Sequence, residues 1–174
     1  MSHVIVLVGL MGSGKTTVGR RLATRLGARF VDTDDVVVAR AGKSVRDIFT
    51  QDGEAVFREL ESKALEDSLC GEGDVVVAAA GGCVLSQANR DTIKNSATLT
   101  MWLDAELSAL AQRVSGGSHR PLLDGGAEEK LLVLERERRE LYQSVCDVRI
   151  DTTGKPVNDV VDEAAALIIK AGVS

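Results

Sequence analysis

The chain lacks an excess of positive charge and lacks any long apolar run. Its 174 residues carry a formal net charge of −5, whereas a nucleic-acid-binding domain needs a basic face. No apolar run approaches the roughly 20 residues that span a bilayer. No basic segment precedes the first apolar run, as one does in a secretory signal. We therefore expect a cytoplasmic protein with neither a nucleic-acid nor a membrane partner.

Cysteine is also scarce, and its spacing matches no familiar metal or redox motif. Cys70, Cys83 and Cys146 form no C-x-x-C pair, and such an odd, scattered set indicates reduced thiols. Thiols of this kind are by default buried as small apolar side chains. Cys83 is the exception to watch, because it directly follows Gly81-Gly82, which we expect near a binding site.

Strand-like and helix-like segments alternate along the whole chain. We expect strands at 4–8, 29–31, 74–80, 97–103 and 147–150, and helices at 16–26, 35–41, 45–51, 53–69, 86–96, 105–114, 128–145 and 156–171. This alternation predicts one α/β domain over residues 1–174, with a parallel sheet of about five strands and helices on both faces. No long exposed apolar surface is evident, so we expect a monomer.

A phosphate-binding loop is predicted at residues 9–17. The pattern G-x-x-x-x-G-K-[ST] begins at Gly9, after an apolar strand and before a helix, which is the context that the motif requires. Backbone N–H groups of such a loop surround phosphate oxygens. Lys15 would reach the β- and γ-phosphates of ATP, and the Thr16 hydroxyl would bind Mg²⁺. The predicted nucleotide contacts are Gly12, Ser13, Gly14, Lys15, Thr16 and Thr17. The alternative is a glycine-rich turn that binds nothing.

Two acidic residues follow the second predicted strand. Many phosphate-loop proteins keep a Mg²⁺-associated Asp after a later apolar strand, but the run 75–80 ends in Gly81-Gly82. Asp32 is therefore the first candidate for the metal, and Asp34 for orienting a substrate hydroxyl and accepting its proton. If the chain stays extended there, both carboxylates point to the same side. Alternatively, Asp34 caps the next helix.

Several further residues allow two interpretations each. Arg58 and Glu61 are neighbours on one helix, either as a surface ion pair or as a guanidinium oriented to bind a carboxylate. Arg120 lies in a Gly/Ser-rich segment and either closes over the γ-phosphoryl group or is solvated. Periodicity does not distinguish Arg138 from its charged neighbours. Gly81-Gly82 either lets the backbone approach a ligand closely or forms a plain tight turn.

Together these motifs resemble the shikimate kinase family, most of all its actinobacterial members. The resemblance covers essentially the whole chain and rests on the order and spacing of six motifs. They are Gly9–Thr17, Asp32-Thr33-Asp34, Gly53-Glu54 through Phe57-Arg58-x-x-Glu61, Gly81-Gly82, Arg120-Pro121-Leu122-Leu123 and Arg138-x-x-x-Tyr142.

The resemblance implies a P-loop NTPase fold and an ATP-dependent, Mg²⁺-requiring enzyme of aromatic amino-acid biosynthesis. It would phosphorylate the 3-hydroxyl of shikimate, with a substrate-binding segment at about 33–62 and a mobile lid at about 113–127. By this resemblance, Asp34 would bind the shikimate hydroxyls, and Arg58 and Arg138 would bind its carboxylate, with Glu61 supporting Arg58. Gly81 and Gly82 would contact the substrate through their backbone, and Arg120 would contact both substrates. Asp32 would lie near the metal, and Arg113 and Pro156 would pack on adenine.

One residue departs from the family pattern, and two other functions are compatible with parts of the sequence. Ala80 stands where the family usually has the first of three glycines; we expect it to be tolerated if it keeps strand geometry. One rival is another small-molecule kinase, for gluconate or a nucleotide, whose acceptor would not need the Arg58–Arg138 pair. The other is a nucleotide-dependent switch or a non-catalytic binding module. No guanine-reading Asn-Lys-x-Asp motif is present.

Overall fold

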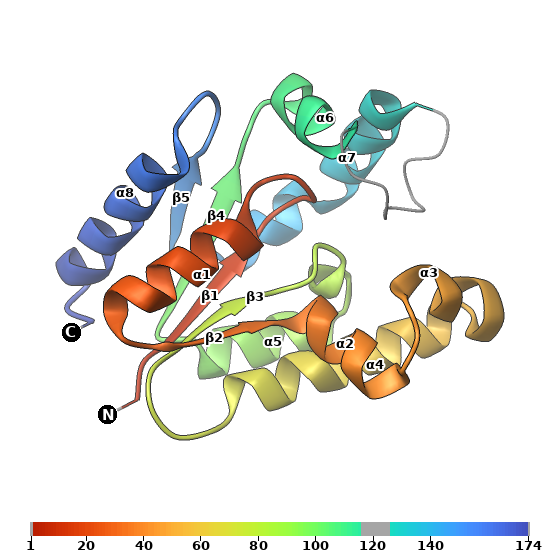
Figure 1. Ribbon diagram of the computed structural model, residues 1–174, viewed down its shortest axis with the longest axis horizontal. Helices are drawn as coiled ribbons and strands as arrows, with labels where there is room; N and C mark the ends of the chain where they lie inside the picture. Colours follow the sequence, from red (N-terminus) through yellow and green to blue (C-terminus); the bar gives the residue numbers. More distant parts are fainter. Residues whose placement is uncertain (1, 116–125, 174) are drawn as a thin grey trace.

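The centre of the protein is a five-stranded parallel sheet. A computed structural model describes residues 2–115 and 126–173, and Figure 1 shows its strands and helices. The strand order is β2-β3-β1-β4-β5, and each neighbouring pair runs parallel. The strands are β1 (Val4–Val8), β2 (Arg29–Asp32), β3 (Val75–Ala78), β4 (Leu99–Asp104) and β5 (Val148–Asp151). The predicted α/β class and sheet are thereby confirmed.

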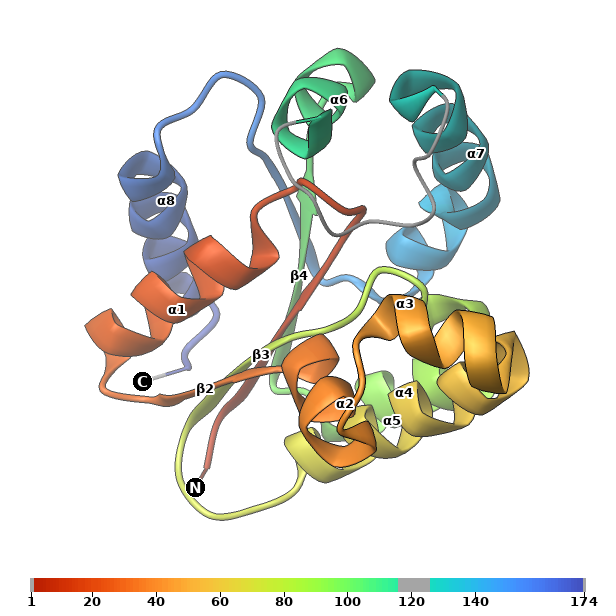
Figure 2. The same ribbon diagram turned by 45° about the vertical axis from the view of Figure 1, so that its right-hand side comes forward.

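Helices cover both faces of the sheet. Helices α1 (Lys15–Leu26) and α8 (Val157–Lys170) pack on one face. The other face is covered by α4 (Glu54–Leu69), α5 (Gln87–Ser96), α6 (Leu107–Ser115) and α7 (Ala127–Val145). Figure 2 shows α1 and α8 together on one side, away from α4, α5 and α7. Strands β3 and β4 are buried along their whole length, because a parallel sheet has helices on both faces.

A smaller helical unit extends beyond the β2 edge of the sheet. It consists of α2 (Thr33–Ala41), the single turn α3 (Val45–Asp47), the π-helical turn η1 (Ile48–Asp52) and the first half of α4. Its own apolar cluster is centred on Val37, Ile48 and Phe57. This unit occupies most of the segment 33–62 in which substrate binding was predicted. Within the described residues, no helix is long and apolar enough to cross a membrane.

Three local expectations need correction. The chain does not stay extended after Asp32; it enters α2 at once, because the Asp32 side chain accepts a hydrogen bond from the Asp34 N–H and so caps the helix. Asp34 is therefore not the cap. The helix expected over 45–51 becomes a π-helical turn from Ile48. Strand β3 ends at Ala78 and not at residue 80, so Ala80 lies in the turn region after the strand.

Candidate active site

The phosphate-binding loop joins β1 to α1 in the predicted strand–loop–helix arrangement. Gly12 and Gly14 have φ angles of 81° and 98°, which residues other than glycine rarely adopt. Helix α1 begins at Lys15 and has no acidic residue in its first turn, so the positive end of its dipole is not offset locally. The Lys15 Nζ donates hydrogen bonds to the carbonyls of Gly9 and Leu10, at 2.8 and 3.0 Å. The loop therefore has the backbone and charge of an anion-binding site.

The Thr16 hydroxyl and the Asp32 carboxylate meet beside this loop. Thr16 Oγ1 donates to Asp32 Oδ2 at 2.6 Å, while Asp32 Oδ1 accepts the Asp34 N–H at 3.0 Å. One aspartate thus fixes both the start of α2 and the hydroxyl at the start of α1. A hydroxyl beside a carboxylate suits Mg²⁺, which is usually bound by one or two protein oxygens together with substrate phosphates and water. The two residues fit the metal that a phosphate-loop kinase needs.

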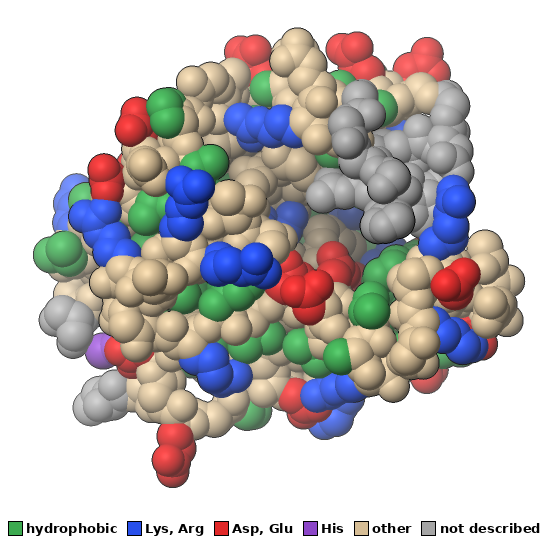
Figure 3. Space-filling view, viewed as in Figure 1, with side chains coloured by type: hydrophobic (Ala, Val, Ile, Leu, Met, Phe, Trp, Pro, Cys, Tyr) green, Lys and Arg blue, Asp and Glu red, His purple; other side chains and the backbone are tan. Residues whose placement is uncertain are grey.

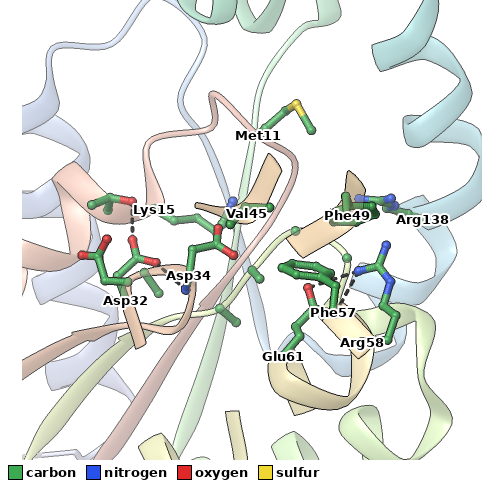
Figure 4. A pocket seen from close by; sticks show the side chains of 17 residues that line it. Met11, Lys15, Asp32, Asp34, Val45, Phe49, Phe57, Arg58, Glu61 and Arg138 are labelled. Atoms are coloured by element: carbon green, nitrogen blue, oxygen red, sulfur yellow. Dashed lines mark hydrogen bonds and ion pairs between the residues drawn. The ribbon is translucent and has the colours of Figure 1, made fainter. Parts of the chain in front are cut away.

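A cavity of about 640 Å³ opens between the phosphate-binding loop, the helical unit and α7. In Figure 3 acidic and basic side chains meet in the hollow of this face. Figure 4 places Lys15, Asp32 and Asp34 on one side and Arg58 and Arg138 on the other. Ala78–Gly82, at the carboxyl end of β3, also line it, where ligands of open parallel sheets bind. The cavity therefore has an acidic side near the phosphate loop and a basic side opposite.

Arg58 is held in place by two carboxylates of its own helix. Glu61 accepts from Arg58 Nη1 at 2.9 Å, and Glu54 accepts from Nη2 at 3.1 Å. The side chain of Glu61 is 2% exposed and that of Arg58 27%. Burial raises the pKa of Glu61 even though Arg58 opposes the shift. Burial lowers the pKa of Arg58, but Glu61 and Glu54 outweigh it and the net shift is upward. The supporting interpretation of Glu61 is thus favoured over a solvated surface pair.

Arg138 is buried, with 4% of its surface exposed. Its Nε has no hydrogen-bond partner within residues 2–115 and 126–173, and its ion pair with the adjacent Glu137 is loose, at 3.6 Å. A buried guanidinium without a close counter-charge is costly. Its position in the wall of the cavity therefore favours an anionic ligand. Arg138 does not belong to the solvated face of α7, although the sequence pattern could not show this.

The Gly81-Gly82 turn contributes backbone groups to the same wall. Within the described part of the chain, the N–H groups of Gly81 and Gly82 make no hydrogen bond, and both residues line the cavity. Gly82 is buried and Gly81 is half-buried. Because buried backbone donors are nearly always paired, these N–H groups favour a ligand at this wall. The Gly81 carbonyl accepts a hydrogen bond from Tyr142.

A second cavity, of about 420 Å³, lies on the other side of the loop. Lys15 and Thr16 line both cavities, so the two adjoin there. Gly12, Ser13, Gly14 and Thr17 also line the second cavity, together with Arg113 and Thr152. Arg113 donates to the Thr152 carbonyl at 2.8 Å and to the Gly12 carbonyl at 3.2 Å. Pro156 is the N-cap residue of α8; its neighbours Lys155 and Val157 line the cavity.

Arg120 and Cys83 are not part of the described site, whereas two phenylalanines that the sequence did not assign to it line the first cavity. Arg120 and most of the predicted lid lie outside the described residues. Cys83 is fully buried and its pKa is raised by that burial, so its thiol is an inert packing group. Phe49 and Phe57, with ring centroids 4.6 Å apart, form an apolar wall of the first cavity. The sequence assigns neither residue a binding role, although Phe57 belongs to a family motif, because an apolar residue at helical spacing is typical of a core.

Fold and site together define a P-loop phosphotransferase with two cavities that adjoin at the phosphate-binding loop. Residues 11–169 match the shikimate kinase family. The chain is 44% identical over 164 residues to a shikimate kinase of Geobacter sulfurreducens, covering 94% of this chain and 90% of that protein. It is 46% identical over 162 residues to one of Symbiobacterium thermophilum, covering 91% and 92%.

The structural comparison agrees. A shikimate kinase from Acinetobacter baumannii, solved in complex with shikimate, superimposes with a TM-score of 0.93 at 31% identity, covering 100% of this chain and 97% of that one. A gluconokinase from Sinorhizobium meliloti shares only the fold, with a TM-score of 0.55 at 22% identity, covering 97% and 92%. The chain belongs to the shikimate kinase family and is an ATP-dependent phosphotransferase with an alcohol acceptor.

Proposed function

We propose that the two adjoining cavities hold ATP and shikimate side by side. The γ-phosphoryl group of ATP passes between them to the 3-hydroxyl of shikimate, giving shikimate 3-phosphate. The bond between the hydroxyl oxygen and the γ-phosphorus forms, the bond to the β-phosphate oxygen breaks, and ADP leaves. Such a transfer needs mainly positioning and charge neutralisation from the protein.

The observation that carries the proposal is the buried Arg138 in the cavity wall. With 4% of its surface exposed, and with an unbonded Nε and a loose ion pair to Glu137 among the described residues, it favours a bound carboxylate. Arg58, held by Glu61 and Glu54, stands on the same side of the cavity in Figure 4. Two guanidinium groups offer the paired N–H donors that a carboxylate accepts. The N–H groups of Gly81 and Gly82 add backbone contacts to the acceptor.

Asp34 faces the acceptor from the opposite, acidic side of the cavity. A shikimate molecule whose carboxylate lies against the arginines would direct its hydroxyl groups toward Asp34 and Lys15. We assign Asp34 the role of orienting the attacking 3-hydroxyl and receiving its proton. Lys15 offsets negative charge on the transferred phosphoryl oxygens. Arg120, outside the described residues, stays a predicted contact of both substrates.

Thr16 would bind Mg²⁺ with its hydroxyl oxygen. Asp32 would lie near the metal and accept the hydrogen bond of that hydroxyl. The metal would supply positive charge to the ATP phosphates. Arg113 and Pro156 would flank the adenine ring in the second cavity, where Arg113 donates hydrogen bonds to Thr152.

We further propose a cytoplasmic monomer without nucleic-acid or membrane partners. Its exposed large apolar residues are spread over several helices, which supports a single copy.

The test measures ADP release with Mg²⁺ and shikimate, quinate, gluconate or no acceptor. We expect turnover with shikimate only. In Arg138→Met the apolar side chain keeps the packing volume, so the protein should stay folded. The shikimate KM should nevertheless rise by about 100-fold, since a buried charge partner is lost. An unchanged shikimate KM in this variant would refute the carboxylate role.

A further inference from the structure

Two buried hydroxyl groups hold the turn that follows β3. Thr33 Oγ1, on α2, accepts a hydrogen bond from the Ala80 N–H at 2.9 Å. Tyr142, on α7, donates from its hydroxyl to the Gly81 carbonyl at 2.6 Å. Thr33 and Tyr142 are each 1% exposed. Figure 2 shows the segment after β3 running between α2 and α7. The turn is thus tied to the two helices that carry Asp34 and Arg138.

Tyr142 is held firmly behind the turn. Its ring lies 6.0 Å from that of Trp102, and Trp102 is flanked by the guanidinium groups of Arg139 and Arg149, at 5.3 and 5.0 Å from its ring centroid. Burial raises the pKa of Tyr142, although Arg138 beside it opposes the shift. The phenol therefore stays protonated and remains a hydrogen-bond donor at any ordinary pH.

The turn supports the basic side of the acceptor cavity. A side chain added at Gly81 would come within 3.8 Å of Arg138 Nη1, and one added at Gly82 would overlap the guanidinium of Arg58. The two arginines therefore flank consecutive residues of one turn. The N–H groups of Gly81 and Gly82, which are available to a ligand, belong to the same turn. Any shift of the peptide groups of this turn therefore changes the spacing between its two N–H groups and the guanidinium groups of Arg58 and Arg138.

We propose that Tyr142 is a positioning residue for the acceptor, acting through the Gly81 carbonyl, and that Thr33 does the same through the Ala80 N–H. The two hydroxyls fix the peptide groups on either side of the turn. They thereby set the place of the Gly82 N–H and the separation of Arg58 and Arg138. This inference rests on the proposed function, in which the shikimate carboxylate binds at these arginines.

The test uses two variants, Tyr142→Phe, which removes only the hydroxyl group, and Thr33→Val, which replaces the hydroxyl with a methyl group. Each should raise the shikimate KM by about tenfold, as expected for the loss of one well-aligned hydrogen bond. The KM for ATP and the kcat at saturating shikimate should stay within about twofold, because neither hydroxyl contacts the nucleotide cavity. A general loss of stability would lower the active fraction and kcat instead, without moving the shikimate KM alone.

Ser68→Ala is the matched control. The Ser68 hydroxyl is also buried and donates to a carbonyl, that of Ala64, at 2.6 Å, but it lines neither cavity. This control should lower the melting temperature and leave the shikimate KM unchanged. If Tyr142→Phe and Thr33→Val behave like Ser68→Ala, the positioning role is wrong. If Arg138→Met also leaves the shikimate KM unchanged, the proposed acceptor site itself is wrong, so the two failures are distinguishable.

Discussion

The guanidinium group of Arg58 lies against Gly82 in the space that a Cβ atom would occupy. A Cβ built on Gly82 would lie 2.9 Å from Arg58 Cζ, closer than real contacts allow, and 3.1 Å from Nη2, which is tighter than most real contacts. Gly82 itself has φ −87° and ψ −9°, which any residue can adopt. Glycine is therefore needed at this position for space, so that the arginine can approach the backbone, and not for the geometry of the turn.

The first prediction follows from this contact. Gly82→Ala should displace the Arg58 guanidinium and raise the shikimate KM by about tenfold or more, since a small misplacement of a binding group is costly. Gly81→Ala is the comparison, because its Cβ would meet no atom closer than 3.4 Å and should have the smaller effect. Steady-state kinetics at saturating ATP measure both. Equal shikimate KM values in the two variants would contradict the steric argument.

The second prediction concerns Glu61 and pH. Its pKa is raised from 4.5 by burial, so the folded state binds this proton more tightly than the unfolded state. The stability that this proton contributes is fully present below the unfolded pKa and is lost as pH rises through the folded pKa. Glu61→Gln, which resembles the protonated form, should therefore gain stability relative to the unmodified protein as the pH rises above the unfolded-state pKa of Glu61.

The same variant should bind shikimate more weakly, because a neutral amide orients Arg58 less firmly than a carboxylate does. Urea unfolding at several pH values, together with the shikimate KM, separates the two effects. A stability difference that moves in the opposite direction with rising pH would show that Arg58, and not burial, dominates the pKa of Glu61.

The third prediction tests the metal role of Asp32. Asp32→Asn keeps a side-chain acceptor for the Asp34 N–H, so the helix cap and the fold should be retained. The carboxylate beside the Thr16 hydroxyl is lost. We expect the Mg²⁺ concentration for half-maximal activity to rise by about 10- to 100-fold. Asp35→Asn, a neighbouring aspartate with no such contact to Thr16, is the control; an equal effect there would point to general electrostatics.

Much of the fold could be predicted from the sequence because its signals are local. The apolar runs, the helix expected over 16–26 and the strand–loop–helix arrangement of the phosphate loop all depend on neighbouring residues, and the structure confirms them. The errors arise where a long-range or competing contact decides. Asp32, the last residue of β2, rather than Asp34 caps α2. Both residues lie near the junction of strand and helix, and only the three-dimensional path of the chain selects one.

The candidate site divides in the same way. Periodicity could not select Arg138 from the charged residues of α7, because its burial depends on the packing of α7 over the sheet; only the family motif indicated it. The sequence did not indicate that Phe49 and Phe57 line the cavity, because their pattern is that of a core, although Phe57 belongs to a family motif. The role of Tyr142 depends on a contact with Gly81, 61 positions away in the chain, which no local pattern encodes.

The fourth prediction concerns Ala80, where the family usually has glycine. Strand β3 ends two residues before Ala80, and no residue other than glycine has a positive φ in the described chain, so Ala80 does not occupy the left-handed region that favours glycine. Its N–H is already paired with Thr33. Ala80→Gly should therefore leave the shikimate KM within about twofold and lower the stability by about 0.5–1 kcal/mol, through greater freedom of the unfolded chain. A large fall in the shikimate KM would show that the methyl group crowds the acceptor.

The central claim is that two arginines on the basic side of the cavity recognise the carboxylate of shikimate. The most direct measurement compares kcat/KM for shikimate and for its methyl ester, in which that charge is absent. We predict that the unmodified protein prefers shikimate by about 100-fold or more, and that Arg138→Met loses most of this preference. Equal kcat/KM values for acid and ester in the unmodified protein would contradict the account.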